Sequence, residues 1–322
     1  MQVIQVRAYG GPEVLTPTEL ATPEPGAGEV RVDLVATGVN FIEIYQRAGD
    51  YPVALPYVPG AEGAGTVSAV GPGVDSVRVG DRVASVDIPG SYAEQALVAA
   101  DRVVPLPDSI TPESAAAALL QGLTAHYLLF DTYPVRPGVV VLVHAAAGGM
   151  GLLLTQLATK LGAQVIGTVS TPDKEALARQ AGATEVIRYT ESNVVDEVKR
   201  ITGGVGVAVA YDGVGKDTFE SSLASLRLRG TLVLYGAASG AVPALDPQRL
   251  QAAGSVFLTR PTLRHHIVTP SELEARSADL FGWIADGTLS IRVHERYPLA
   301  QARKAHEDLQ DRRTAGKLLL VP

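Results

Sequence analysis

The stretch VHAAAGGMG, residues 143–151, follows a valine-rich run and decides what the middle of the chain can form. Gly148 and Gly151 match the second and third glycines of the pattern GxGxxG, in which a strand turns into a helix beside a pyrophosphate. Ala146 stands at the first glycine position, whose role is the tight turn. The N-terminus of the predicted helix Met150–Leu161 would offer free N–H groups to an anion. The stretch therefore predicts a nucleotide-binding turn, with an unliganded glycine-rich turn as the alternative.

Strands and helices alternate along the chain after this turn. The predicted strands cover residues 139–144, 164–169, 185–188, 207–212, 231–235 and 256–259. The predicted helices cover residues 150–161, 173–181, 193–201 and 217–226. Because strands that alternate with helices are joined by right-handed crossovers, this order predicts a doubly wound parallel sheet.

The first 120 residues have a different pattern, in which short apolar runs are separated by glycine and proline turns. Such runs are typical of strands in a small, sharply bent barrel. A helix is predicted after Thr111, a suitable N-cap that precedes Pro112. Beyond Pro261 a polar helical stretch leads to the apolar segment KLLLVP, residues 317–322. No helix follows that segment, which leaves it able to return to the first domain.

The composition disfavours several classes of protein. The 322 residues suffice for about two domains. The absence of cysteine excludes disulfides, a thiol nucleophile and thiolate metal sites, and the six histidines lack a metal-binding spacing. A net charge of −7 disfavours nucleic acid as the main partner. No apolar run has membrane-spanning length and MQVIQVRAYG lacks a signal-peptide pattern, so we expect a cytoplasmic protein.

The end of the second predicted strand indicates which nucleotide is bound. An NAD site places an acid about 20 residues after the glycines, where it holds the ribose 2′-hydroxyl. The strand ends here in Val169–Thr171, without an acid, and Asp173 fits better in the first turn of a helix that begins at Pro172. Lys174 is close enough to neutralise a 2′-phosphate, so the stretch predicts NADPH. An ordinary solvated lysine is the alternative.

The side chains of one further segment suit a metal-free reduction. Without a metal ion, a hydride acceptor must be easy to reduce or must receive hydrogen bonds from hydroxyl and amide groups. The segment GVNFIEIYQRAGDYP, residues 38–52, supplies Asn40, Tyr45 and Tyr51, and a phenol is a donor at neutral pH. Rim or packing roles explain both tyrosines equally well. His144, at a strand end, is favoured as a packing or turn residue over a catalytic one.

Nine short motifs are spread over nearly the whole chain. They are GGPEVL (10–15), GVNFIEIYQRAGDYP (38–52), PGAEGAGTVSAVGPGV (59–74), VGDRV (79–83), LQGLTAHYLL (120–129), HAAAGGMG (144–151), YDGVG (211–215), TRPTL (259–263) and TAGKLLL (314–320). In this combination the chain resembles the quinone oxidoreductases of the zeta-crystallin type, a zinc-free branch of the medium-chain dehydrogenase/reductase superfamily. Alanine normally holds the first glycine position of the loop in that family, as Ala146 does here.

The resemblance implies an α/β protein with two domains. A GroES-like β-barrel catalytic domain, built from residues 1–120 and 262–322, would enclose a Rossmann domain of residues 121–261. The Rossmann domain, a doubly wound parallel sheet, would bind NADPH, and the active cleft would lie between the domains. The resemblance further implies a homodimer. No membrane partner is expected, since no apolar run is long enough to span a membrane.

The resemblance also implies which residues form the site. The expected cofactor contacts are Ala147, Gly148, Gly149, Met150, Gly151, Ser170, Lys174, Tyr189, Tyr235, Gly236 and Arg312. Among these, the residues expected around the 2′-phosphate are Lys174, Tyr189 and Arg312, with Ser170 nearby. The residues expected to line the nicotinamide and substrate cleft are Asn40, Tyr45, Tyr51 and Thr124. Arg188, before the tyrosine, either adds charge to the pocket or faces solvent.

No metal site is expected. Zinc-dependent relatives carry Gly-His-Glu where this chain has Gly60-Ala61-Glu62, so the metal-binding histidine is missing. The expected activity is reduction of a small-molecule quinone by NADPH, by hydride or by single electrons. Reduction of the C=C bond of an enone or enal is a second possibility. A third is an NADPH-binding redox sensor or nucleic-acid-binding protein with little catalysis.

Overall fold

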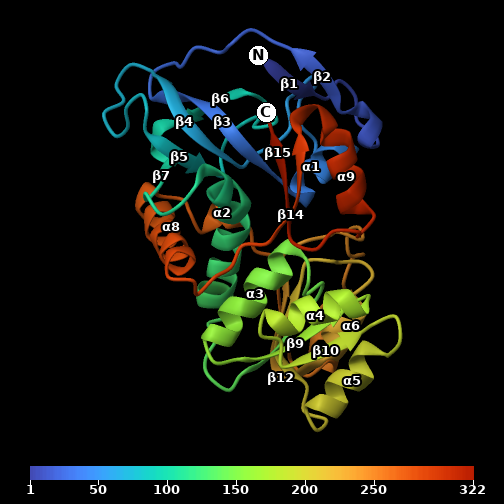
Figure 1. Ribbon diagram of the computed structural model, residues 1–322. Coiled ribbons are helices and arrows are strands. Elements are labelled where there is room, and N and C mark those ends of the chain that lie inside the picture. The colour runs from blue at the N-terminus through green and yellow to red at the C-terminus, as the bar shows by residue number, and fades with distance from the viewer. The chain divides into compact units, whose positions relative to one another are not determined.

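The computed structural model describes residues 1–322, which form two compact units (Figure 1). Unit 1 comprises Met1–Gln121, Ile267–Gly287 and Ile291–Pro322. Unit 2 comprises Gly122–His266 and Thr288–Ser290. His266 in unit 2 stacks its ring on Tyr127 at 4.1 Å, and its Nδ1 lies 3.2 Å from Asp131 Oδ2. The predicted boundaries at 120/121 and 261/262 lie close to these divisions, and the family's domain limits stay a prediction.

Unit 2 is built on a six-stranded parallel sheet in the order β10-β9-β8-β11-β12-β13. Its strands are β8 (Val140–Val143), β9 (Gln164–Val169), β10 (Glu185–Arg188), β11 (Val207–Asp212), β12 (Leu226–Leu234) and β13 (Phe257–Thr259). The chain first moves outward from β8 to β10 and then returns to add β11 on the other side. The predicted doubly wound sheet is therefore confirmed, and its strand order reverses between β8 and β11.

The helices of unit 2 connect these strands. They are α3 (Gly149–Lys160), α4 (Pro172–Gln180), α5 (Val194–Ile201), α6 (Phe219–Ala224) and α7 (Gln248–Ala252). Unit 2 also contains the π-helical segment η3 (Leu128–Thr132) and the short 3₁₀ helix η4 (Leu263–His265). Helices α3 and α4 pack on β8, β9 and β10. Buried Leu142, Ile166 and Leu232 of the sheet share a core with Val198 of α5 and Phe219 of α6. The helix predicted at 217–226 is shorter, because the chain already becomes extended at Leu226, and α7 was not predicted.

Unit 1 is built on a seven-stranded sheet in the order β14-β15-β3-β4-β5-β7, with β6 also paired to β3. The strands are β3 (Glu29–Val39), β4 (Gly63–Val70), β5 (Arg82–Ser85), β6 (Gln95–Ala99), β7 (Val104–Pro105), β14 (Val293–Pro298) and β15 (Lys317–Val321). A separate hairpin joins β1 (Gln2–Gln5) to β2 (Thr16–Glu19). Strand β15 pairs antiparallel with β3, Leu318 opposite Val39, which confirms that the apolar C-terminal segment returns to the first part of the chain.

Four helices and three short turns complete unit 1. They are α1 (Phe41–Ala48), α2 (Pro112–Tyr127, whose last residues belong to unit 2), α8 (Pro270–Ala285), α9 (Ala302–Gln310), η1 (Pro12–Val14), η2 (Ala100–Arg102) and η5 (Leu299–Gln301). Thr111 caps α2 as predicted, since its Oγ1 accepts the N–H of Ser114 at 3.1 Å. Helix α1 was not predicted. None of these helices combines the length and the apolar character that crossing a membrane requires.

Candidate functional site

The carboxyl ends of β8 and β11 lie side by side where the strand order reverses, which is where doubly wound sheets bind nucleotides. The loop after β8 turns at Ala145, whose φ is 51°, and leads to Gly148, the N-cap of α3. Gly148 is extended, with φ −75° and ψ 171°. The N–H groups of the first turn of α3 lack partners within the helix and so favour an anion at this point.

Ala146 fits this turn because of a glycine on the neighbouring strand. Its side chain is buried, and its N–H donates to the carbonyl of Thr168 at 3.0 Å. A Cβ added to Gly167 on β9 would lie 2.8 Å from the Cβ of Ala146. The alanine methyl therefore occupies space that Gly167 leaves free. The third glycine has no such freedom, since a Cβ on Gly151 would lie 2.2 Å from the carbonyl oxygen of Ala145.

The ends of β9 and β10 bring together three of the residues predicted for the 2′-phosphate. Thr171 caps α4, as predicted, by accepting the N–H of Lys174 at 3.3 Å, which places Lys174 in the first turn. Ser170 O accepts the hydroxyl of Thr190 at 3.0 Å, and Tyr189 N–H donates to Val169 O at 3.1 Å. Ser170, Lys174 and Tyr189 thus share one edge of the sheet, whereas Arg312 belongs to unit 1.

The remaining predicted residues of unit 2 occupy distinct places. Arg188 is held by two carboxylates, Glu175 Oε2 at 3.1 Å and Glu191 Oε1 at 2.6 Å, so its charge is already compensated. Tyr235 and Gly236 follow β12 at the same sheet edge as the glycine turn. Tyr235 N–H donates to Asp212 O at 2.9 Å, at the end of β11. Both residues therefore lie on the β12 side of the place between β8 and β11 where the strand order reverses.

His144 is buried and its two ring nitrogens are both engaged. Nδ1 lies 3.0 Å from the hydroxyl of Thr168 and Nε2 lies 2.9 Å from that of Ser222. Ser222 in turn donates to Asp212 Oδ2 at 2.6 Å. Burial lowers the pKa of His144, so the ring is neutral. The network joins β8, β9 and β11 directly below the nucleotide turn, in agreement with the structural role that the sequence favours.

Helix α1 in unit 1 presents the predicted tyrosines. Tyr45 lies on the helix and is half-buried, and Tyr51 follows it and is exposed. Their rings meet edge to face at 5.4 Å, and Tyr51 N–H donates to Tyr45 O at 3.2 Å. The two phenols are therefore held as a pair. Thr124, also half-buried, lies on the part of α2 that belongs to unit 2.

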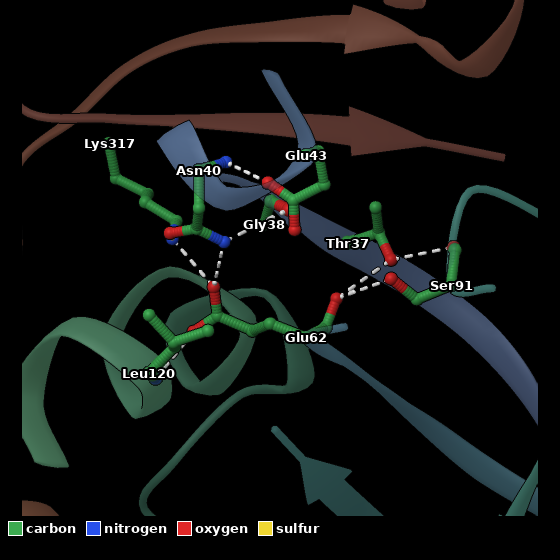
Figure 2. Close-up of polar contacts among 8 residues, drawn as sticks. All are labelled: Thr37, Gly38, Asn40, Glu43, Glu62, Ser91, Leu120 and Lys317. Carbon is green, nitrogen blue, oxygen red and sulfur yellow. Dashed lines mark hydrogen bonds and ion pairs between the residues drawn. The ribbon is translucent and has the colours of Figure 1, made fainter. Parts of the chain in front are cut away.

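Asn40, the N-cap of α1, is buried and its amide is engaged within unit 1 (Figure 2). Its Nδ2 donates to Glu62 Oε2 at 3.2 Å and to the Gly38 carbonyl at 3.4 Å. Its Oδ1 accepts from Lys317 Nζ at 2.7 Å. The same ammonium lies 2.6 Å from Glu62 Oε2, in an ion pair with both side chains at most 1 % exposed. The amide is thus bonded to a buried ion pair.

Glu43, in the first turn of α1, lies beside this pair. Its Oε2 accepts the N–H of Asn40 at 2.7 Å, and its Oε1 accepts no hydrogen bond from the protein. Burial raises the pKa of Glu43 to about 7, against the opposing effect of the Lys317 ammonium. The first turn of α1 therefore contains a carboxyl group that changes charge near neutral pH.

Known proteins resemble the chain along its whole length. The alcohol dehydrogenase GroES-like domain matches residues 26–108, and the zinc-binding dehydrogenase family matches residues 149–281. A quinone oxidoreductase of Pseudomonas aeruginosa is 49% identical over 321 residues, 99% of each chain. The chain belongs to the quinone oxidoreductase family. Another relative, a 2-haloacrylate reductase of a Burkholderia species, is 41% identical over 98% of each chain.

Solved structures of quinone oxidoreductases and their relatives agree with this assignment. The structure of mycobacterial Rv1454c complexed with NADPH has 52% identity and a TM-score of 0.98, with all of both chains covered. The Escherichia coli quinone oxidoreductase complexed with NADPH has 44% identity and a TM-score of 0.98, again with all of both chains covered. The predicted family, the GroES-like and Rossmann fold and the cofactor NADPH are therefore confirmed.

The residues of this quinone oxidoreductase do not fit the zinc ion that the matched family's description implies. The chain supplies no cysteine, and no cluster of three histidine or carboxylate side chains could hold a metal ion. Glu62, next to the position of the missing histidine, is neutralised by Lys317. NADPH fits better, because Gly148 has no side chain at the first turn of α3, where free N–H groups would favour a phosphate.

Sequence reasoning missed two structural features of unit 1. One is helix α1, although Asn40 and Glu43 have the spacing of a capping box. The other is the partnership of Glu62 with Lys317, which are 255 residues apart. A lysine within the apolar segment KLLLVP was the only signal for it, because a buried lysine requires a partner.

Proposed function

We propose that the protein is an NADPH-dependent quinone reductase that needs no metal ion. The observation that carries the proposal is the glycine turn after β8 together with the acid-free end of β9, where Lys174 lies in the first turn of α4. NADPH, when bound, supplies a hydride. Since quinones accept electrons readily, orientation and hydrogen bonding suffice for the reaction.

The side chains of the two units have different tasks in this proposal. The turn Ala147–Gly151 binds the pyrophosphate, and Ser170, Lys174, Tyr189 and Arg312 bind the 2′-phosphate. Tyr235 and Gly236 contact the rest of the cofactor. The hydroxyls of Tyr45 and Tyr51 donate hydrogen bonds to the quinone oxygens, because phenols remain protonated at neutral pH. Asn40 and Thr124 line the substrate site. The amide of Asn40 acts through its fixed orientation, since Glu62 and Lys317 bond it.

Replacing Lys174 with methionine is expected to raise the Kd for NADPH about tenfold or more and to leave that for NADH within about twofold. The reason is that only NADPH carries the 2′-phosphate. Nucleotide fluorescence titrations measure both constants. Lys199→Met, which removes a lysine from α5, is the control and should change neither constant. Equal losses for both nucleotides in Lys174→Met would remove Lys174 from the phosphate site.

Steady-state assays test the function directly. The protein is given NADPH or NADH with a benzoquinone, a naphthoquinone and a 2-alkenal. We expect rapid oxidation of NADPH with the quinones and much slower oxidation of NADH. Turnover of the alkenal alone would reject quinone reduction. NADPH binding without turnover of any acceptor would instead support a binding or sensing protein.

Reduction of a conjugated C=C bond is the second candidate function. The relative named a 2-haloacrylate reductase favours it, since an acrylate carries such a bond. The same tyrosine hydroxyls would then donate to the carbonyl oxygen of the substrate. The alkenal in the assay above separates this activity from quinone reduction. The cytoplasmic location stays a prediction that cell fractionation tests.

A homodimer joined through β13 is part of the proposal. This strand is an edge of the unit 2 sheet, and its Phe257 is 63% exposed. An unpaired edge with an apolar side chain suits pairing with a second copy across a two-fold axis. Phe257→Lys is expected to yield monomers in sedimentation velocity experiments. Val205→Lys, at an equally exposed apolar residue away from this edge, should remain dimeric. A monomeric wild-type protein would contradict the dimer.

A further inference from the structure

Glu62 connects four separate segments of unit 1 through one carboxylate and its own carbonyl (Figure 2). Its Oε2 accepts from Lys317 on β15 and from Asn40 at the start of α1. Its Oε1 accepts the N–H of Leu120, within α2, at 2.7 Å. The carbonyl accepts the hydroxyl of Ser91 at 2.9 Å. Glu62, Lys317, Asn40 and Ser91 are buried, and Leu120 lies within α2.

The charges of this cluster dictate which way the amide of Asn40 faces. The ammonium of Lys317 attracts Oδ1, and the carboxylate of Glu62 attracts Nδ2. The flipped amide would direct its hydrogens at the ammonium and its oxygen at the carboxylate. Because charge-assisted hydrogen bonds are the strong ones, a single orientation is retained. The backbone closes over the cluster, since a Cβ on Gly38 would lie 2.0 Å from Glu62 Oε2.

A second buried network fixes the other end of α1. Arg47 donates to the Gly10 carbonyl at 3.2 Å, to His306 Nδ1 at 3.1 Å and to Gln310 Oε1 at 2.9 Å. Since arginine is only a donor, His306 Nδ1 is the acceptor, and Nε2 is left to donate to the hydroxyl of Tyr92 at 3.0 Å. Residues from α9 and β15 thus bind the two ends of α1.

Helix α1 depends on these contacts because it has only eight residues. A helix of that length is marginal in water by itself, so tertiary contacts determine its position. We propose that Lys317 is a positioning residue for quinone reduction. Together with Glu62 it fixes Asn40 and the start of α1, and thereby the pair Tyr45 and Tyr51. This proposal rests on the quinone reductase function proposed above.

Charge-balanced variants test it. Lys317→Met leaves the carboxylate of Glu62 buried without its cation, which destabilises the protein for reasons unrelated to catalysis. The double variant Glu62→Gln/Lys317→Met removes both charges and is expected to recover most of that stability. Without the two charges, neither of the two orientations of the Asn40 amide is favoured by charge. Arg102→Met is the matched control, because it breaks an ion pair with Asp87 in unit 1 that does not touch α1.

Two measurements decide the outcome. The double variant is expected to lose about 10- to 100-fold in kcat/KM for the quinone, with the Kd for NADPH changed less than about twofold. Hydrogen exchange, followed by mass spectrometry, should be faster in residues 41–48 of the double variant and unchanged there in Arg102→Met. Wild-type values for kcat/KM and for exchange in the double variant would overturn the proposal. A wild-type protein without quinone turnover would reject the proposed function, while exchange in residues 41–48 would still test the positioning.

Discussion

Alanine in place of Gly151 is expected to destabilise unit 2 by about 3 kcal/mol and to lower NADPH affinity about 100-fold or more. The added Cβ would lie 2.2 Å from Ala145 O and 2.6 Å from Ala146 Cα. Both are backbone atoms, which no change of rotamer can move away. The start of α3 must therefore shift, and the nucleotide turn shifts with it. Urea unfolding followed by circular dichroism measures the stability, and fluorescence titration measures the affinity.

Gly148→Ala provides the matched control for that variant. Its Cβ would meet nothing closer than Ala145 O at 3.2 Å, and the extended backbone of Gly148 suits any residue. Its stability should change by less than about 1 kcal/mol. NADPH affinity should still fall, because the methyl group would lie on the bare backbone that a phosphate approaches. Equal stability of the two variants would show that the packing of α3 does not require glycine at position 151.

Glutamine in place of Glu43 is expected to remove the contribution of this one carboxyl to the pH dependence, a loss of stability of about 2–3 kcal/mol between pH 5 and 8. The reason is that burial raises the pKa of Glu43 to about 7 in the folded protein, from 4.5. Between these values the folded state keeps a proton that the unfolded state releases. Raising the pH therefore favours unfolding until the carboxyl is ionised in both states. Glutamine does not titrate and can still accept the N–H of Asn40.

The stability contribution of His306 changes with pH in the direction opposite to that of Glu43. Burial, together with Arg47, lowers the pKa of His306 to about 3 from 6.5. Over that window the unfolded state binds the extra proton, so stability rises with pH. The two effects oppose each other between pH 4.5 and 6.5. In that range Glu43→Gln should become more stable with rising pH while the wild type changes little.

The fluorescence of Trp283 reports these changes, since it is the only tryptophan and lies in unit 1. Urea midpoints at several pH values, for wild type and Glu43→Gln, give the comparison. Parallel pH profiles for the two proteins would contradict the assignment of a raised pKa to Glu43. A variant that is less stable than the wild type by the same amount at every pH would also contradict it, since Glu43 would then contribute nothing to the pH dependence.

Unit 2 could be predicted well because its sequence signals are local. The turn at Gly148, the cap at Thr171 and the alternation of strands with helices each depend on neighbours within a few residues. The strand predicted at residues 231–235 was too short, because β12 already begins at Leu226. A bend at Arg229, whose φ is 58°, interrupts the register that strand periodicity assumes.

Unit 1 could be predicted less well because its decisive contacts are distant in sequence. The sequence offers Asn40 as an amide donor, and the family resemblance implies that it lines the substrate cleft. The structure shows that its amide is already bonded to Glu62 and Lys317. A pattern of apolar residues at β15 explains its burial and its return to β3, but no local pattern says which carboxylate will meet the lysine there.

The distance between Glu62 and Lys317 has a consequence for how the protein is made. The ribosome must synthesise the whole of unit 2 after Glu62 and before Lys317. During that interval the edge of β3 that later receives β15 stays unpaired, and the carboxylate lacks its cation. Unit 2 has nearly all of its own residues in one continuous segment and is able to fold as it emerges. During synthesis, unit 2 can therefore complete its sheet before β15 pairs with β3 in unit 1.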